Sequence, residues 1–114
     1  MQECIFCKIA KKEVPSQIVY ENDKVVAFRD AKPVAPVHVL IVPKEHIESL
    51  KDINGDNADI LIDIHLAANE VAKITGIYER GYRLINNCGV DAGQSVRHLH
   101  YHLIGGAHLG PKIL

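Results

Sequence analysis

The feature that most constrains the fold is a run in which three histidines alternate with apolar residues, His98-Leu99-His100-Tyr101-His102. Successive side chains of a β-strand point to opposite faces of the sheet. The run therefore predicts a strand over residues 98–104 with two different faces. The leucines and the tyrosine belong to a core, and the opposite face carries a row of imidazoles.

Four other segments also predict strands, over residues 18–20, 25–28, 37–42 and 82–86. The first two are joined by the turn-forming residues Glu21-Asn22-Asp23-Lys24, which is typical of a hairpin. Pro43 ends the third strand. A short helical turn is expected over residues 4–10, before Pro15.

One long helix is expected from about Asn57 to Thr75, because apolar residues recur there at three- and four-residue spacing: Ile60, Ile64, Ala67, Val71 and Ile74. Asp56 is a suitable N-cap, and Gly76 stands where a helix often ends in the left-handed conformation. Strands in a run, with one long helix between the third and the fourth, indicate an α+β fold. We expect a mostly antiparallel five-stranded sheet with one long and one short helix.

The composition is that of an ordinary globular protein, with 47% apolar and 24% charged residues in 114. We expect a single domain over residues 1–114. The net charge of −1 argues against a nucleic-acid polymer as partner but allows a small anionic ligand. There is no apolar run long enough to span a membrane and no export signal, so we expect a cytoplasmic protein. In that reducing compartment the three cysteines do not predict disulfides.

The row of imidazoles allows two kinds of chemistry. Alternate histidines on a strand can chelate zinc, and a neutral imidazole can also attack phosphorus. The preceding loop favours the second, because it offers backbone N–H groups and neutral donors of the kind that hold phosphate: Asn87, Gly89, Gly93, Gln94 and Ser95.

With these residues the sequence resembles the histidine triad family, whose signature is three histidines that alternate with hydrophobic residues. The resemblance covers nearly the whole chain. It includes Ile5-Phe6-Cys7-Lys8-Ile9, Ala27-Phe28-Arg29-Asp30, the run from Pro36 to Ile47, Gly105-Gly106 and Leu109-Gly110-Pro111. The branch that it most resembles contains nucleoside phosphoramidases, which form homodimers whose sheets join into one continuous sheet.

The resemblance implies a covalent mechanism on a purine nucleotide. His100 would attack the α-phosphorus and become nucleotidylated, and water would then release the nucleoside monophosphate. The carbonyl of His98 would orient His100, His102 would bind phosphoryl oxygens, and Ser95 would donate to the leaving group. Asn87 and the backbone near Gly93 and Ser95 would stabilise the oxyanion.

The nucleoside would bind earlier in the chain. By the same resemblance, Asp30 would accept hydrogen bonds from the ribose hydroxyls, and His38 would form hydrogen bonds within the site. An apolar slot for the base would be formed by Ile5, Phe6, Ile9 and Phe28. From the residues alone, these apolar side chains are equally consistent with an ordinary core.

Cys4 and Cys7 are separated by two residues, a spacing that suits zinc. Some members of the family bind a structural zinc through this pair together with two histidines, which here would be His46 and His98. No cofactor is needed for the catalysis itself. The alternative is two reduced cysteines packed as small apolar side chains, which is also the expectation for Cys88.

Two departures from the family pattern bear on the substrate. Arg97 stands just before the first histidine, where relatives often have an aromatic residue. The residues up to Leu114 include no tryptophan, whereas some relatives use residues near the C-terminus to select the leaving group. Three hypotheses therefore stand. The first is a hydrolase of adenosine or guanosine phosphoramidates. The second is a dinucleoside polyphosphate hydrolase or nucleotidyl transferase that uses the same His100. The third is a zinc- or nucleotide-binding module without physiological catalysis.

Overall fold

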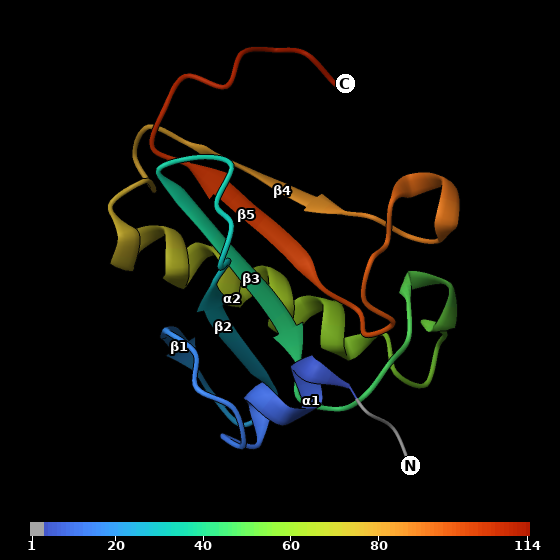
Figure 1. The fold of residues 1–114 in the computed structure, drawn as a ribbon. Helices are drawn as coiled ribbons and strands as arrows, with labels where there is room; N and C mark the ends of the chain where they lie inside the picture. The colour runs from blue at the N-terminus through green and yellow to red at the C-terminus, as the bar shows by residue number, and fades with distance from the viewer. Residues whose placement is uncertain (1–3) are drawn as a thin grey trace.

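The computed structural model describes residues 4–114 and contains one five-stranded sheet with the strand order β1-β2-β3-β5-β4 (Figure 1). Each neighbouring pair is antiparallel. The strands are β1 (Ile18–Glu21), β2 (Val25–Arg29), β3 (Val37–Pro43), β4 (Tyr82–Asn86) and β5 (Tyr101–Gly105). The helices are α1 (Ile5–Ala10) and α2 (Asp59–Thr75), with the 3₁₀ turns η1 (Leu50–Asp52) and η2 (Val90–Ala92). The predicted α+β architecture is confirmed.

Both faces of the sheet are covered, which explains why its inner strands β2, β3 and β5 are mostly apolar on both sides. Along β2, Val25 and Ala27 belong to a core cluster with α2, whereas Val26 and Phe28 belong to a second cluster with α1. In Figure 1, α2 passes behind the sheet and α1 lies in front of it. We call these two sides the α2 face and the α1 face.

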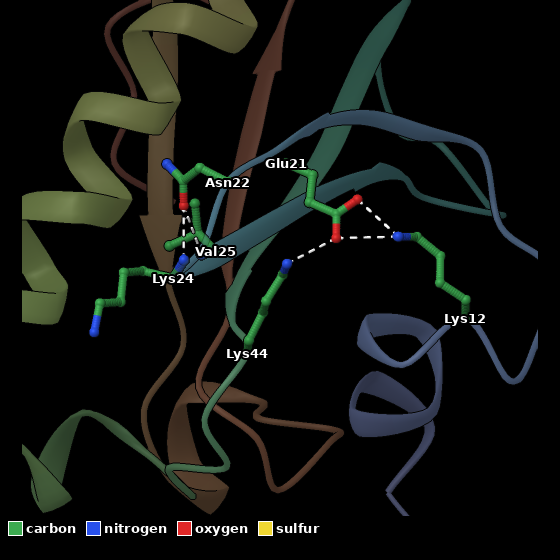
Figure 2. A network of polar contacts seen from close by, with 6 residues as sticks. All are labelled: Lys12, Glu21, Asn22, Lys24, Val25 and Lys44. Atoms are coloured by element: carbon green, nitrogen blue, oxygen red, sulfur yellow. Dashed lines mark hydrogen bonds and ion pairs between the residues drawn. The ribbon is translucent and has the colours of Figure 1, made fainter.

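The hairpin between β1 and β2 forms as predicted, and its turn is held by one side chain. Asn22 Oδ1 accepts hydrogen bonds from the backbone N–H groups of Lys24 and Val25, at 2.8 and 3.0 Å. Beside the turn, Figure 2 shows the Glu21 carboxylate between the ammonium groups of Lys12 and Lys44, at 2.9 and 2.7 Å. This ion-pair network ties the segment after α1 to the sheet.

The long helix begins later than predicted. Its N-cap is Ala58, which makes no side-chain capping bond, so the expectation of Asp56 as the cap was wrong. The amide oxygens of Asn54 and Asn57 hold the preceding turn instead. Gly76 ends the helix in the left-handed conformation, as expected, at φ 81°. Ile74, the last apolar residue of the spacing that predicted the helix, lies in α2 but is 57% exposed.

The histidine run also differs from its prediction, because β5 begins only at Tyr101. Tyr101 pairs with Ile41 of β3, so the same register would place Pro43 opposite Leu99. Proline has no N–H to donate to a ladder, and β3 ends there. Leu99 N–H instead bonds the carbonyl of Ile47. The histidines thus enter the strand from an extended loop.

No helix in residues 4–114 is long and apolar enough to cross a membrane.

Candidate active site and metal cluster

The three alternating histidines share one face, as predicted, although only His102 lies in the strand. Leu99, Tyr101 and Leu103 pack into the core on the α2 face. The rings of His98 and His100 contact Phe6 of α1, at centroid distances of 5.8 and 5.1 Å. His98 is fully buried and His100 is nearly so. Helix α1 therefore covers part of the imidazole row.

The ring of His100 has a defined orientation. Its Nδ1 lies 2.7 Å from the carbonyl oxygen of His98, which can only accept. Nδ1 must therefore carry the proton, and the neutral ring presents an unprotonated Nε2. Among the residues that the structure describes, Nε2 has no hydrogen-bond partner. A nitrogen lone pair held in this way is a potential nucleophile.

His102 is oriented by a chain of hydrogen bonds that passes through His38 and starts at a backbone amide. Val34 N–H donates to His38 Nδ1 at 3.1 Å, so the neutral ring of His38 carries its proton on Nε2. That N–H lies 2.9 Å from Nδ1 of His102 and 3.5 Å from a carboxylate oxygen of Asp30. His102 Nδ1 then accepts, and its Nε2–H is available to donate. Burial, followed by the neighbouring His100 and His38, lowers the pKa of His102, which favours the neutral ring.

Asp30, His38 and His102 are close enough to hold a metal ion. Hydrogen bonds explain their contacts, however. Val34 N–H donates to His38 Nδ1, so the proton of His38 lies on Nε2, the nitrogen that would have to bind the metal.

The loop between β4 and β5 uses most of its amides to hold its own shape. Gln94 accepts from Gly89 N–H and donates to the carbonyls of Glu48 and Val96. Asn87 Nδ2 donates to Ala92 at 2.8 Å. Glycines at φ 87° and 82° begin and end η2, where a side chain would be strained: Gly89 and Gly93. Ser95 is exposed, and in the described chain its hydroxyl has no protein partner.

A cavity of about 680 Å³ opens between α1 and the end of β2; the three alternating histidines do not line it, but its lining residue Phe6 contacts the rings of His98 and His100. Its volume lies in the usual range for small-molecule sites. All the residues that sequence analysis assigned to the base and ribose line it, together with His38: Ile5, Phe6, Ile9, Phe28 and Asp30. Asn87, Gly93, Gln94 and Ser95 are not among its lining residues.

Cys4, Cys7, His46 and His98 form a four-residue cluster that could hold a metal ion. His98 Nδ1 lies 3.3 Å from Cys4 Sγ, 3.6 Å from Cys7 Sγ and 3.2 Å from His46 Nδ1. Tetrahedral zinc with ordinary Zn–S and Zn–N bonds would place its ligand atoms about 3.4 to 3.8 Å apart. The cluster fits this arrangement within a few tenths of an ångström.

The protonation of the cluster also suits a metal. His98 Nε2 lies 2.8 Å from the Pro43 carbonyl and must donate to it, so Nδ1 faces the cysteines unprotonated. Burial lowers the pKa of His98 to about 4, with smaller effects of the neighbouring histidines. Burial and the adjacent Cys4 raise the pKa of the Cys7 thiol, so a cation is needed to hold Cys7 as a thiolate at neutral pH.

Sequence reasoning missed several contributors. Asn86 donates from Nδ2 to the His100 carbonyl at 3.0 Å, while its buried Oδ1 has no partner in the described part of the chain. Its position just before the predicted loop was the only available signal. The nucleoside-sized cavity is also lined by residues to which sequence analysis assigned no role in the site: Pro15, Ser16, Gln17, Arg29, Ala31, Pro33, Pro36 and Leu40. Cys88 is half-buried and Arg97 is exposed.

Comparison with known proteins gives consistent matches over the full chain. Residues 3–113 match the family model described as "Scavenger mRNA decapping enzyme C-term binding". The purine nucleoside phosphoramidase of Escherichia coli K12 is 45% identical over 98% of this chain and 94% of that protein. A HIT family hydrolase from Clostridium thermocellum superposes with a TM-score of 0.97 at 64% identity, covering 100% and 99% of the two chains. A histidine triad protein from Clostridium difficile gives 0.94 at 52% identity, covering 98% and 97%.

Proposed function

Because the chain belongs to the histidine triad family, we propose that it is a purine nucleoside phosphoramidase, which hydrolyses the phosphorus–nitrogen bond of a nucleoside phosphoramidate. The observation that carries the proposal is the unprotonated Nε2 of His100, held by the His98 carbonyl on a ring that packs against Phe6, which lines the nucleoside-sized cavity. The curated relative of that name supplies the reaction class.

The reaction proceeds in two displacements. His100 Nε2 attacks the α-phosphorus, a nitrogen–phosphorus bond forms, and the bond to the leaving amine breaks. The leaving nitrogen takes a proton, for which Ser95 is the proposed donor. Water then attacks the phosphorus of nucleotidyl-His100 and gives one proton back to Ser95. A phosphorus–oxygen bond forms, the bond between phosphorus and His100 Nε2 breaks, and the nucleoside monophosphate leaves with the histidine in its starting form.

The charge on the phosphoryl oxygens is stabilised by neighbouring donors. His102 donates from Nε2, the nitrogen that the His38 chain leaves protonated. The backbone N–H of Ser95 and the second amide hydrogen of Asn87 form the rest of the cradle, while the N–H groups of Gly93 and Gln94 hold the loop by bonding the carbonyls of Val90 and Gly89. Gln94 contributes by holding this loop, since its amide is already bonded to the protein.

The nucleoside occupies the cavity next to α1. The base packs against Ile5, Phe6, Ile9 and Phe28, and the Asp30 carboxylate accepts hydrogen bonds from the ribose hydroxyls. Lys32 N–H already bonds one Asp30 oxygen at 2.8 Å, which fixes the carboxylate for this task.

We further propose that the Cys4, Cys7, His46 and His98 cluster holds a structural zinc. Zinc would be a fixed cross-link between α1 and the segment that carries the histidines. Its contribution is to stability and to the position of Phe6, which packs on His100. The proposed catalytic steps do not use it.

The chain is also proposed to form a homodimer through β4. This strand is at the edge of the sheet and leaves one side of its backbone unpaired in the described chain. Ile62 and Leu66 of α2 are each 60% exposed. Asn69, on the same helix, bonds Tyr82 of β4, so the apolar patch runs beside the open edge. Sedimentation analysis of the wild type and Leu66→Asp tests this, and a wild-type monomer contradicts it.

The test of the activity compares two substrates with purified wild type and His100→Ala. An adenosine phosphoramidate should release adenosine monophosphate with the wild type and not with the variant. Mass spectrometry of the quenched wild-type reaction should detect the nucleotidyl adduct on His100. Cleavage of a diadenosine polyphosphate alone would replace the phosphoramidase proposal by a polyphosphate hydrolase, and binding without cleavage of either would indicate a binding module.

A further inference from the structure

Two cations belong to the segments around the loop between β4 and β5, which we call the catalytic loop, and the proposed mechanism uses neither of them: Lys51 and Arg97. Both side chains are exposed. Within residues 4–114, neither the Lys51 ammonium nor the Arg97 guanidinium makes a hydrogen bond or an ion pair. Two positive charges next to the catalytic loop are therefore available to a ligand.

Lys51 approaches the catalytic loop from η1. The segment before η1 is joined to the loop by the hydrogen bond from Gln94 Nε2 to the Glu48 carbonyl, at 2.7 Å. In Figure 1, the green η1 segment lies beside the orange loop. A Cβ atom on Gly89 would lie 3.7 Å from Lys51 Nζ. The ammonium group therefore stands next to the loop backbone, two residues after Asn87 of the proposed phosphate cradle.

Arg97 is held at the surface close to Ser95. Its neighbour Val96 packs against the cluster on the α1 face, and His98 is fully buried, so the side chain between them remains outside the core. Ser95 precedes Arg97 by two residues, which separates their backbones by at most about 7 Å. An extended arginine side chain can span that distance. The guanidinium can therefore reach a group attached to the nitrogen that Ser95 is proposed to protonate.

The acidic residues of the same segments do not neutralise the two cations. Asp52 accepts hydrogen bonds from the backbone N–H and the hydroxyl of Ser49. Glu48 and Asp91 are exposed, and neither carboxylate makes an ion pair in the part of the chain that the structure describes. An anionic ligand would therefore not have to displace a protein carboxylate from either cation.

We propose that Lys51 and Arg97 select the leaving group, and that the preferred leaving amine carries an anionic group, as an amino acid carries its carboxylate. This inference rests on the proposed phosphoramidase reaction. In an in-line displacement the amine departs on the side of the phosphorus opposite His100. The rest of the leaving group then extends past Ser95 to the two cations. Arginine is suited to this contact because its planar fork donates two parallel hydrogen bonds to a carboxylate.

The test uses three adenosine phosphoramidates whose leaving amines differ mainly in charge: glycine, glycinamide and aminomethylphosphonate. The quantity measured is kcat/KM for the glycine substrate divided by kcat/KM for the glycinamide substrate. This ratio cancels the effect of a substitution on steps that both substrates share. Arg97→Gln should lower the ratio about fivefold and Lys51→Gln about threefold, as expected for ion pairs near the surface. The aminomethylphosphonate substrate shows whether a phosphate-like group is preferred to a carboxylate.

Two control variants test whether charge at this place is the cause. Lys51→Arg keeps the positive charge and should keep the ratio. Lys24→Gln removes an exposed charge at the β1–β2 turn and should also keep it; Figure 2 shows the Lys24 ammonium group without a dashed contact. Raising the ionic strength from about 0.01 M to about 1 M should lower the wild-type ratio, because salt screens exposed charges.

The outcomes separate this inference from the reaction on which it rests. If the wild type hydrolyses both the glycine and the glycinamide substrates and the two glutamine variants keep its ratio, the assignment of Lys51 and Arg97 is overturned and the phosphoramidase proposal stands. If the wild type hydrolyses neither substrate, the phosphoramidase proposal fails, and this inference fails with it.

Discussion

Replacing His38 should impair catalysis although His38 is not the proposed nucleophile. Its ring accepts from Val34 N–H and donates to His102 Nδ1, so it determines which nitrogen of His102 carries the proton. In His38→Leu this donor is lost. His102 can then carry its proton on Nδ1 and turn an unprotonated Nε2 toward the phosphoryl oxygens, where a donor is needed. His38→Gln keeps both functions, because its amide can accept from Val34 and donate to His102.

The size of the effect follows from the lost donor. A hydrogen bond to a charged oxygen contributes about 1.5 to 3 kcal/mol, so kcat/KM should fall about 10- to 150-fold in His38→Leu. His38 is 6% exposed, and His38→Leu loses the two hydrogen bonds that its ring makes to Val34 N–H and His102 Nδ1. This should cost about 1 to 3 kcal/mol of stability, or about 4 °C in Tm for each kcal/mol in a chain of this length.

The assay is steady-state hydrolysis of an adenosine phosphoramidate at 25 °C, with thermal melts to show that each variant is folded. His38→Gln should retain most of kcat/KM, and the loss in His38→Leu should fall mainly on kcat, because the donor acts on charge that develops in the transition state. Equal kcat/KM values for the leucine and glutamine variants would refute the tautomer argument.

Three other predictions follow from the structure. Zinc at 100 times its Kd should stabilise the fold by about 2.7 kcal/mol, so removing it with a strong chelator should lower Tm by about 11 °C. The Tm of Cys7→Ser should change less on addition of zinc or of the chelator. Gly105→Ala should destabilise the fold by about 1 to 3 kcal/mol in denaturant unfolding, because its Cβ would lie 2.9 Å from the buried Cδ1 of Ile77; an unchanged midpoint would contradict this. The hydrogen bonds from Lys44 and Lys12 lower the pKa of Glu21, so their contribution is present above pH 4.5 and is lost as the pH falls through the lowered value. Glu21→Gln should therefore cost about 0.5 to 1 kcal/mol at pH 7 and almost nothing at pH 2, as measured by urea titration at both values.

Local patterns were enough to predict most of the elements, because each reports a short-range physical preference. The spacing of Ile60, Ile64 and Val71 predicted α2, and all three are buried. The turn residues around Asn22 predicted the hairpin that Asn22 indeed holds. The alternation from His98 to His102 correctly placed the three imidazoles on one face, since that depends only on extended backbone.

The start of β5 could not be found in this way. Residues 98–100 have the alternation of a strand, but whether they pair depends on which residue of β3 stands opposite. That residue is Pro43, which lies more than fifty positions earlier in the chain and cannot donate to the ladder. Register is a property of two strands together, and neither sequence segment contains it alone.

The sequence by itself determined which chemical groups this protein has and on which elements they lie: a nucleophilic imidazole, a pair of cysteines two residues apart, a carboxylate after β2. Only the tertiary structure decided which of them meet. The sheet order places β3 beside β5, and this adjacency brings His46 to His98, joins His38 to His102, and gives each ring its protonated nitrogen through Pro43, Val34 or a neighbouring carbonyl. Proton placement depends on hydrogen-bond partners that are distant in sequence, and for that reason it becomes visible only in the folded chain.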